Sequence, residues 1–264
     1  MATIMSAAEF ERVVADARDR TEQMQREGRR LIAVVRRWTV ALGPQGAGLD
    51  AMLSKIDSQI NQTGNLVTEF FMNPGVPWTL WSHGSDWAGP PIAGQISSQI
   101  SRATLDEMRV DDFWTGVAAD AYKNSLPRQK EAMSALAASA RTIDDVLTSM
   151  AIAIGAFWLA FLAALVEVVL IIMACVAAAS TGVGAPAGAG GAAAAVAKFV
   201  GVTLAILSAF YTFIMVNTVP KIKDLEQDLH DNAAYPGGHW PRPTVDLADG
   251  RSSDGDPSDW NLKG

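Results

Sequence analysis

Two long apolar runs near the middle of the 264-residue chain limit what it can fold into. Glu167 is the only charged residue of Met150–Ala179, and Lys198 is the only charged residue of Ala192–Val219. Both runs exceed the about 20 apolar residues that a helix needs to cross the hydrocarbon core of a bilayer. The short stretch between the runs carries no charge. The sequence therefore predicts a hydrophobic, transmembrane helical hairpin over residues 150–219.

The composition supports a membrane association. Hydrophobic residues make up 49% of the chain and charged residues 19%, with a mean hydropathy of +0.15. These values are apolar for a soluble globular domain, so a membrane segment is favoured. The net charge is −7 and there is no basic block that could meet a phosphate backbone, so we expect no nucleic-acid partner.

The N-terminal segment, 1–72, carries two amphipathic helical patterns. Apolar and small residues recur in alternating steps of four and three, as in a helix that packs along another helix. The Gly/Pro-containing stretch Gly43–Gly48 ends the first pattern, and so short a connection makes the two helices antiparallel neighbours. The stripes consist of Phe10, Val14, Ala17, Thr21, Met24, Gly28, Leu31, Val35, Trp38 and Leu42, and of Leu49, Leu53, Ile56, Ile60, Thr63, Val67 and Phe70.

The predicted fold class is all-α, with long antiparallel helical hairpins of which one is hydrophobic. Prolines at three places should keep residues 73–91 irregular, and the tryptophans Trp78, Trp81 and Trp87 there should plug the end of the helical bundle. Sugar binding or a position at a bilayer interface is the alternative for these tryptophans. The expected segments are an amphipathic hairpin over 1–72, a Trp/Pro-rich connector over 73–91, a second helical hairpin over 92–149, the hydrophobic hairpin over 150–219, a short helix over 220–232 and a disordered acidic tail over 233–264.

Two charged residues interrupt the apolar runs. A charge at the centre of a membrane helix costs roughly 2.5–3.5 kcal/mol, so Glu167 either lines a polar surface or an oligomer contact, or is tolerated as a protonated carboxyl. Lys198 is close enough to the end of its run for its side chain to reach the membrane surface. Folding the hairpin about Pro186 places Glu167 farther from the turn than Lys198, so we expect no direct pair between them.

Small residues recur every four positions in the second apolar run. Such a ridge lets helix backbones approach closely, which is how helices associate in lipid. We therefore expect the two hydrophobic helices to pack closely on each other or on further copies. The ridge consists of Ala193, Ala197, Gly201, Ala205 and Ala209.

No residue pattern indicates an enzyme. The three histidines are scattered, without a second ligand at metal-binding spacing, and the single cysteine, Cys175, lies within the first apolar run. No nucleophile elbow or phosphate-binding lysine motif occurs. We expect no catalytic, cofactor-binding or metal site, and no cofactor.

The decapeptide Phe113–Tyr122 resembles the Trp-x-Gly turn of the WXG family of helical hairpin proteins, substrates of type VII secretion in actinobacteria and Firmicutes. Trp114 and Gly116 match the motif, small residues follow, and Tyr122 matches the aromatic position on the second helix. The resemblance implies a helical hairpin around this turn and places it within the segment 92–149. The family's C-terminal Tyr-x-x-x-Asp/Glu signal is absent here, and small family members lack a hydrophobic hairpin.

Two functions follow as hypotheses. The first is a non-enzymatic, type VII secretion-associated scaffold or interaction protein embedded in the cell membrane, in contact with the bilayer and with itself, a small WXG-type partner or the secretion machinery. Arg141, Lys221 and Lys223 flank the hairpin, whose loop has no basic residue, so both termini would be cytoplasmic. The alternative is a helical effector, secreted or in the cell envelope, that inserts its hydrophobic hairpin into a target membrane as a pore-forming toxin would.

Overall fold

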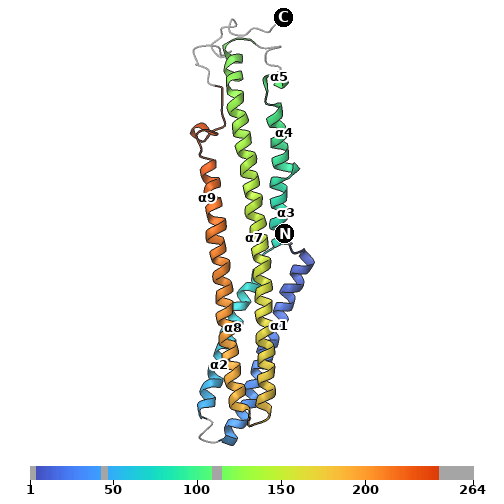
Figure 1. Cartoon of the computed structure of the whole chain (residues 1–264), viewed down its shortest axis with the longest axis vertical. Helices are drawn as coiled ribbons and strands as arrows, with labels where there is room; N and C mark the ends of the chain where they lie inside the picture. The colour runs from blue at the N-terminus through green and yellow to red at the C-terminus, as the bar shows by residue number, and fades with distance from the viewer. Residues whose placement is uncertain (1–3, 43–46, 109–114, 244–264) are drawn as a thin grey trace. The chain divides into compact units, whose positions relative to one another are not determined.

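The computed structural model describes residues 4–42, 47–108 and 115–243, and these residues fold into helices joined by short turns (Figure 1). The all-α class is therefore confirmed. The α-helices are α1 (Ala7–Leu42), α2 (Ala47–Met72), α3 (Pro77–Ala88), α4 (Gln95–Arg102), α5 (Leu105–Met108), α7 (Val117–Ser180), α8 (Ala185–Phe213) and α9 (Val219–Asp228).

The helices form two compact units that do not follow the order of the chain. The first unit combines the N-terminal segment up to Trp78 with Met150–Ile214. The second unit combines Thr79–Ser149 with the chain from Met215 onward. The amphipathic hairpin and the hydrophobic hairpin, which the sequence analysis treats as separate segments, thus belong to one unit.

Helix α1 begins with a reciprocal cap. The backbone N–H of Ser6 donates to Oε2 of Glu9 at 2.9 Å, and the backbone N–H of Glu9 donates to the hydroxyl of Ser6 at 3.3 Å. Two backbone donors that the helix cannot satisfy are paired in this way. The hydrogen bonds from the Ser6 hydroxyl and backbone hold the pKa of the Glu9 carboxyl below its usual value.

The two predicted stripes form the buried faces of α1 and α2. Every fully apolar stripe residue from Phe10 to Val35 is buried or half-buried, as is the whole stripe from Leu49 to Phe70. The two helices approach closely at Gly28, because a Cβ at this position would overlap the end of the Ile60 side chain. The heptad prediction is confirmed over these two ranges, whereas Trp38, near the end of the first stripe, is 36% exposed and the side chain of Leu42 lies outside the described part of the structure.

The connector over residues 73–91 is more regular than predicted. Helix α3 occupies most of it and begins at Pro77, because a proline in the first helical turn has no N–H that the helix needs to satisfy. Trp78 packs against Phe10 in an edge-on contact at 5.6 Å, as expected of a residue that closes the bundle. Trp81 and Trp87 are exposed instead.

Residues 92–108, part of the helical hairpin expected over 92–149, do not form one continuous helix. Ile92 lies in a π-helical turn, η2 (Pro90–Gly94), and the chain then breaks between α4 and α5 near Ala103. Helix α7, by contrast, continues through Pro127 for 64 residues. One helix therefore contains both the end of the segment predicted over 92–149 and the first hydrophobic run from Met150.

Part of the tail that the sequence marks as disordered packs on α7. Helix α9 ends at Asp228 and a turn follows. The hydroxyl of Tyr235 then donates to the carbonyl of Ala132 at 3.0 Å, and the side chain of Gln129 donates to the carbonyl of Pro241 at 3.4 Å. The prediction of disorder is therefore wrong for residues 233–243, where one aromatic ring anchors the chain, and residues 244–264 lie outside the described part.

Candidate functional site: the hydrophobic hairpin and its cover

A short turn, Thr181–Gly184, joins the hydrophobic part of α7 to α8. The hydroxyl of Thr181 donates to the carbonyl of Ala178 at 2.8 Å and accepts from the backbone N–H of Gly184 at 3.2 Å. Gly182 has a φ of +79°, which favours glycine, and a Cβ there would lie 2.7 Å from the ring of Trp38. The turn is therefore tight, and it packs against Trp38 near the end of α1.

The structure corrects the prediction that Glu167 and Lys198 do not pair. Helix α8 begins at Ala185, with Pro186 in its first turn, so most of the Gly/Ala-rich stretch is helix rather than loop. Glu167 therefore lies as far before the end of α7, at Ser180, as Lys198 lies after the start of α8. The two side chains are level with each other, and they form an ion pair at 2.5 Å with 52% and 60% of their surfaces exposed.

Helices α7 and α8 pack closely at two glycines that lie nearer the turn than the predicted ridge. A Cβ on Gly188 would lie 2.7 Å from the carbonyl oxygen of Cys175, and a Cβ on Gly191 would lie 3.0 Å from its sulfur. These two glycines were not singled out from the sequence, although small residues on one side of a helix are what lets two helices approach closely.

Most of the ridge is not packed against another helix of the first unit. Ala193 is half-buried, whereas Ala197, Gly201, Ala205 and Ala209 are exposed, and a Cβ on Gly201 would meet nothing within 4 Å. Of the two packing partners expected for the ridge, the hairpin's own helices and further copies, only the second is compatible with this exposure.

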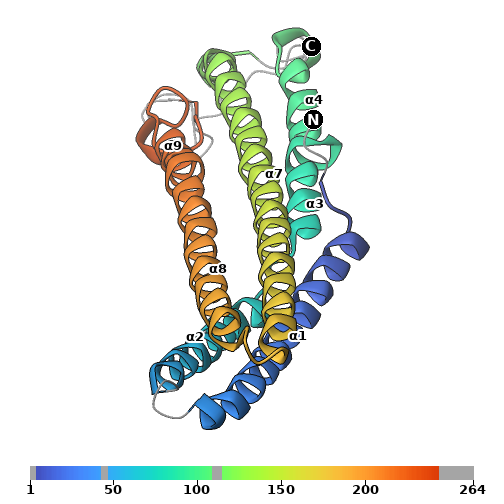
Figure 2. The same cartoon turned by 60° about the horizontal axis from the view of Figure 1, so that its bottom comes forward.

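One face of the hydrophobic hairpin is covered by the α1–α2 hairpin (Figures 1 and 2). Trp158 of α7 is the centre of this contact and only 1% of its surface is exposed. Its ring stacks on Phe71 of α2 at 5.6 Å and meets Phe10 of α1 edge-on at 6.3 Å, while its Nε1 donates to the carbonyl of Pro74 at 2.8 Å. Burial of so many aromatic rings makes this contact the main core of the first unit.

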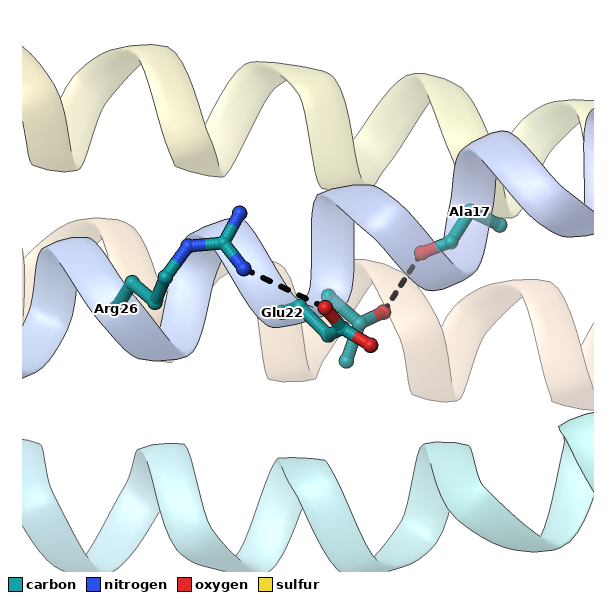
Figure 3. Close-up of polar contacts among 4 residues, drawn as sticks. Ala17, Glu22 and Arg26 are labelled. Carbon is teal, nitrogen blue, oxygen red and sulfur yellow. Dashed lines mark hydrogen bonds and ion pairs between the residues drawn. The ribbon is translucent and has the colours of Figure 1, made fainter.

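The α1–α2 cover is strongly polar on its outer side. Figure 3 shows Glu22 and Arg26 of α1, which form an ion pair at 3.4 Å on the outer surface of the helix. Thr21, one residue earlier, turns inward, and its hydroxyl donates to the carbonyl of Ala17 at 2.8 Å. The exposed arginines of α1 are Arg12, Arg18, Arg20, Arg26, Arg29, Arg30, Arg36 and Arg37.

The rest of the hydrophobic hairpin is open. Helix α7 and the helix that begins at Ala185 are both long and apolar enough to cross a membrane, with mean hydropathies of 2.9 and 2.2 in their most apolar stretches. Only 44% of the first stretch and 11% of the second is buried. Leu170, Leu204 and Tyr211 are each more than half exposed. A core helix of a soluble protein would be mostly buried. An exposed apolar surface of this kind is typical of a site that contacts lipid or another protein.

An apolar groove with a volume of about 310 Å³ runs along the line where α7 and α8 meet. Alanines form its rims, and phenylalanine rings form much of its wall. Its lining residues are Ala153, Ala156, Phe157 and Ala160 of α7 and Ile206, Ala209, Phe210 and Phe213 of α8.

Two polar atoms are buried in the first unit without a hydrogen-bond partner among the described residues. They are Oγ1 of Thr203 on α8 and Oε1 of Gln59 on α2. Thr63 on α2, by comparison, donates its hydroxyl to the carbonyl of Gln59 at 2.7 Å. An unsatisfied buried polar atom costs roughly 1–3 kcal/mol, so the packing of this unit carries a local penalty.

The described residues that resemble the Trp-x-Gly motif lie just before and within the first two turns of α7. Trp114 lies outside the described residues. Gly116 precedes α7 and has a φ of +110°, a backbone conformation that favours glycine at the motif's turn. Tyr122 lies on the second turn of α7 and is half-buried. The role of the motif as the end of a helical hairpin stays a prediction.

Within residues 4–42, 47–108 and 115–243, no three His, Cys, Asp or Glu side chains come together in a way that could hold a metal ion. Comparisons of the chain with protein-family models, with characterised proteins and with solved structures find no match. The exposed hydrophobic hairpin and its polar cover are therefore the features on which a function can be argued.

Proposed function

We propose that the chain is a non-enzymatic, type VII secretion-associated helical protein that carries a hydrophobic hairpin partly covered by α1 and α2, and that inserts this hairpin into a membrane when the cover is released. The observation that carries the proposal is the packing of a charged helical hairpin on one face of a membrane-length apolar one. The association with type VII secretion rests on the resemblance around Trp114, Gly116 and Tyr122.

The covered form is incompatible with a membrane-spanning hairpin. Trp158 packs at the same level as Phe10 and Phe71, so α1 and α2 would lie at the depth of the bilayer if α7 and α8 crossed it. Each arginine on the outer side of α1 would then cost roughly 2.5–3.5 kcal/mol near the bilayer centre. The cover must therefore leave before the hairpin can span.

One feature favours release of the cover, and another favours insertion of the hairpin. Thr203 and Gln59 each bury an oxygen without a partner among the described residues, so contact with water would relieve a penalty. The turn between α7 and α8 has no charged residue, and Val183 at its tip is 96% exposed. An apolar, uncharged tip can enter the hydrocarbon region ahead of the two helices.

A lock across the cover tests the proposal. The side chains of Gln23 on α1 and Met173 on α7 meet at 3.6 Å. Cysteines at these two positions, in a Cys175→Ala background, can be bridged by a short bismaleimide. Phosphatidylcholine–phosphatidylglycerol vesicles loaded with a fluorescent dye then report insertion through dye release and through resistance of the bound protein to carbonate extraction.

We expect the unbridged protein to insert and release dye, and the bridged protein to do neither. The variant with a cysteine at Met173 alone, treated with the same reagent, is the matched control and should insert. Equal insertion of the bridged protein would show that the cover does not have to leave. Failure of the unbridged protein to enter vesicles would refute the membrane-inserting function.

The exposure of α8 favours a second candidate function, a scaffold that resides in the membrane of the producing cell with both termini in the cytoplasm. Its most apolar stretch is only 11% buried, so lipid would cover what the protein leaves open. Fractionation of the producing cells separates the two functions. Protein found only in carbonate-resistant membranes supports the resident scaffold, and soluble protein found only in the culture supernatant supports the secreted, inserting form.

A further inference from the structure

The face of the hydrophobic hairpin opposite the cover combines an apolar groove with one ion pair. On α7, Ala153, Ala160 and Glu167 recur at heptad spacing and therefore lie along one side of the helix. On α8, Lys198 and Ala209 are separated by close to three full turns and share a side in the same way. The groove and the Glu167–Lys198 pair thus belong to one strip, which we name the seam face.

The rims of the seam face are left uncovered within the described first unit, although Phe157 in the wall of the groove also contacts Phe70 of α2 at 5.6 Å. The residues of α7 that meet the cover, such as Trp158 and Phe161, are buried, whereas Ala156, Ala160 and Ala209 on the groove rims are exposed. Helix periodicity places these two groups on different sides of α7. The groove is therefore open to a partner while α1 and α2 remain in place.

We propose that the seam face binds the seam face of a second copy of this chain, with the two hairpins parallel and related by a twofold axis along their length. Charge complementarity favours a second copy of the chain in this parallel arrangement. In a parallel pair, α7 of each copy faces α8 of the other, so that each Glu167 meets the Lys198 of its partner. An antiparallel pair centred at the same level would place Glu167 against Glu167 and repel.

The shape and chemistry of the seam face suit a copy better than lipid. An acid and a base that are half exposed lose hydration in hydrocarbon without gaining a partner, whereas a second copy supplies two further opposite charges. Alanines on both rims let the helices approach closely, and the phenylalanine rings of the groove supply apolar surface. Leu204 and Tyr211 lie off this strip on the other side of α8 and carry no charge, so the lipid-facing surface remains apolar.

A pair of opposite charge variants tests the contact between copies. Glu167→Lys presents two bases on the seam face, and Lys198→Glu presents two acids. We expect each variant alone to self-associate about tenfold or more weakly than the unaltered full chain in sedimentation equilibrium, because like charges then meet across the axis. An equimolar mixture should regain the dimer, because a basic seam face meets an acidic one.

Recovery in the mixture separates contacts between copies from the contact within one chain, which mixing cannot restore. A mixture that associates as weakly as the single variants would refute the proposal. So would an unaltered chain that is monomeric at micromolar concentration.

Cross-linking tests the parallel arrangement. Ala156 lies as far before the end of α7, at Ser180, as Ala209 lies after the start of α8, at Ala185, so the two should meet between copies of a parallel pair. One chain carries Ala156→Cys and the other Ala209→Cys, both with Cys175→Ala, so that no disulfide can form within a chain. We expect oxidation of the mixture to give a disulfide-linked heterodimer in detergent-free buffer.

The matched control replaces Ala209→Cys with Tyr211→Cys, which is also exposed but faces away from the groove, and should give little product. Equal cross-linking of both mixtures would refute the seam-face contact. Loss of the Ala156–Ala209 product when phosphatidylcholine–phosphatidylglycerol vesicles are added, with the chain bound to them, would also overturn the proposal, because lipid would then occupy the seam face.

Discussion

The two halves of α7 belong to one helix but are buried by different means. Up to Ser149 its buried residues are mostly small, among them Ala119, Ala132 and Ala140, and side-chain hydrogen bonds attach other segments to it. From Met150 onward its buried residues include large apolar ones, with Trp158 and Phe161 at the centre of an aromatic cluster. A continuous helix can therefore be held by small residues and hydrogen bonds in one half and by large apolar side chains in the other. The rise in hydropathy along α7 marks where the segments that pack on it change.

Removal of the largest aromatic side chain should have the greatest effect. Trp158→Ala loses a ring that contacts aromatic rings of α1, α2 and α7, and it leaves the carbonyl of Pro74 without its donor. We expect a loss of about 3–5 kcal/mol in the free energy of unfolding, measured by urea denaturation followed by circular dichroism. Trp81→Ala, at an exposed position, should cost less than about 0.5 kcal/mol. Similar losses in both variants would contradict the assignment of the core to the second half of α7.

Two glycines of α8 provide a matched pair at the next level of effect. Gly188→Ala places a methyl group against the backbone of α7 at Cys175 and should destabilise the fold by about 1–3 kcal/mol. Gly201→Ala, in open space, should instead stabilise it by up to about 1 kcal/mol, because alanine is the better helix former. Thermal denaturation of the two variants should therefore shift in opposite directions. A common direction would mean that the hairpin does not pack closely at Gly188.

The sequence predicts where the helices of this chain lie better than it predicts which helices pack against one another. The stripes of α1 and α2 follow from heptad spacing alone, and the apolar runs of α7 and α8 from length and hydropathy. Which surface covers the hydrophobic hairpin does not follow, because a heptad stripe fits any apolar helix. The start of α8 is also not evident from the sequence, since the glycines and Pro186 lower the helix propensity of this stretch and packing of Gly188 against α7 overrides it. The Glu167–Lys198 pair could not be predicted without that start.

A substitution at a buried position of α8 tests the cost of an unsatisfied hydroxyl without changing the shape of the side chain. Thr203→Val keeps the shape of the side chain and removes a buried hydroxyl that has no partner among the described residues. We expect a gain of about 1 kcal/mol in unfolding free energy. If release of the cover limits insertion, the same variant should also release vesicle dye more slowly. The control is Thr63→Val, which removes a hydroxyl that is hydrogen-bonded to Gln59 and should destabilise. A destabilised Thr203→Val would mean that water satisfies this hydroxyl.

The smallest expected effect concerns the first half of α7 and depends on pH. Tyr235→Phe removes the hydrogen bond to Ala132 and should lower stability at pH 8 by at most about 1 kcal/mol. Burial and the negative charge of Asp228 raise the pKa of Tyr235 above its usual value. The fold therefore favours the neutral phenol, and this contribution is complete below the pKa of the unfolded chain and is lost as pH rises through the folded value. Urea denaturation at pH 8 and pH 11 should show the two proteins converging at the higher pH. Parallel pH profiles for Tyr235→Phe and the unaltered chain would mean that the tail after α9 does not hold the polar half of α7.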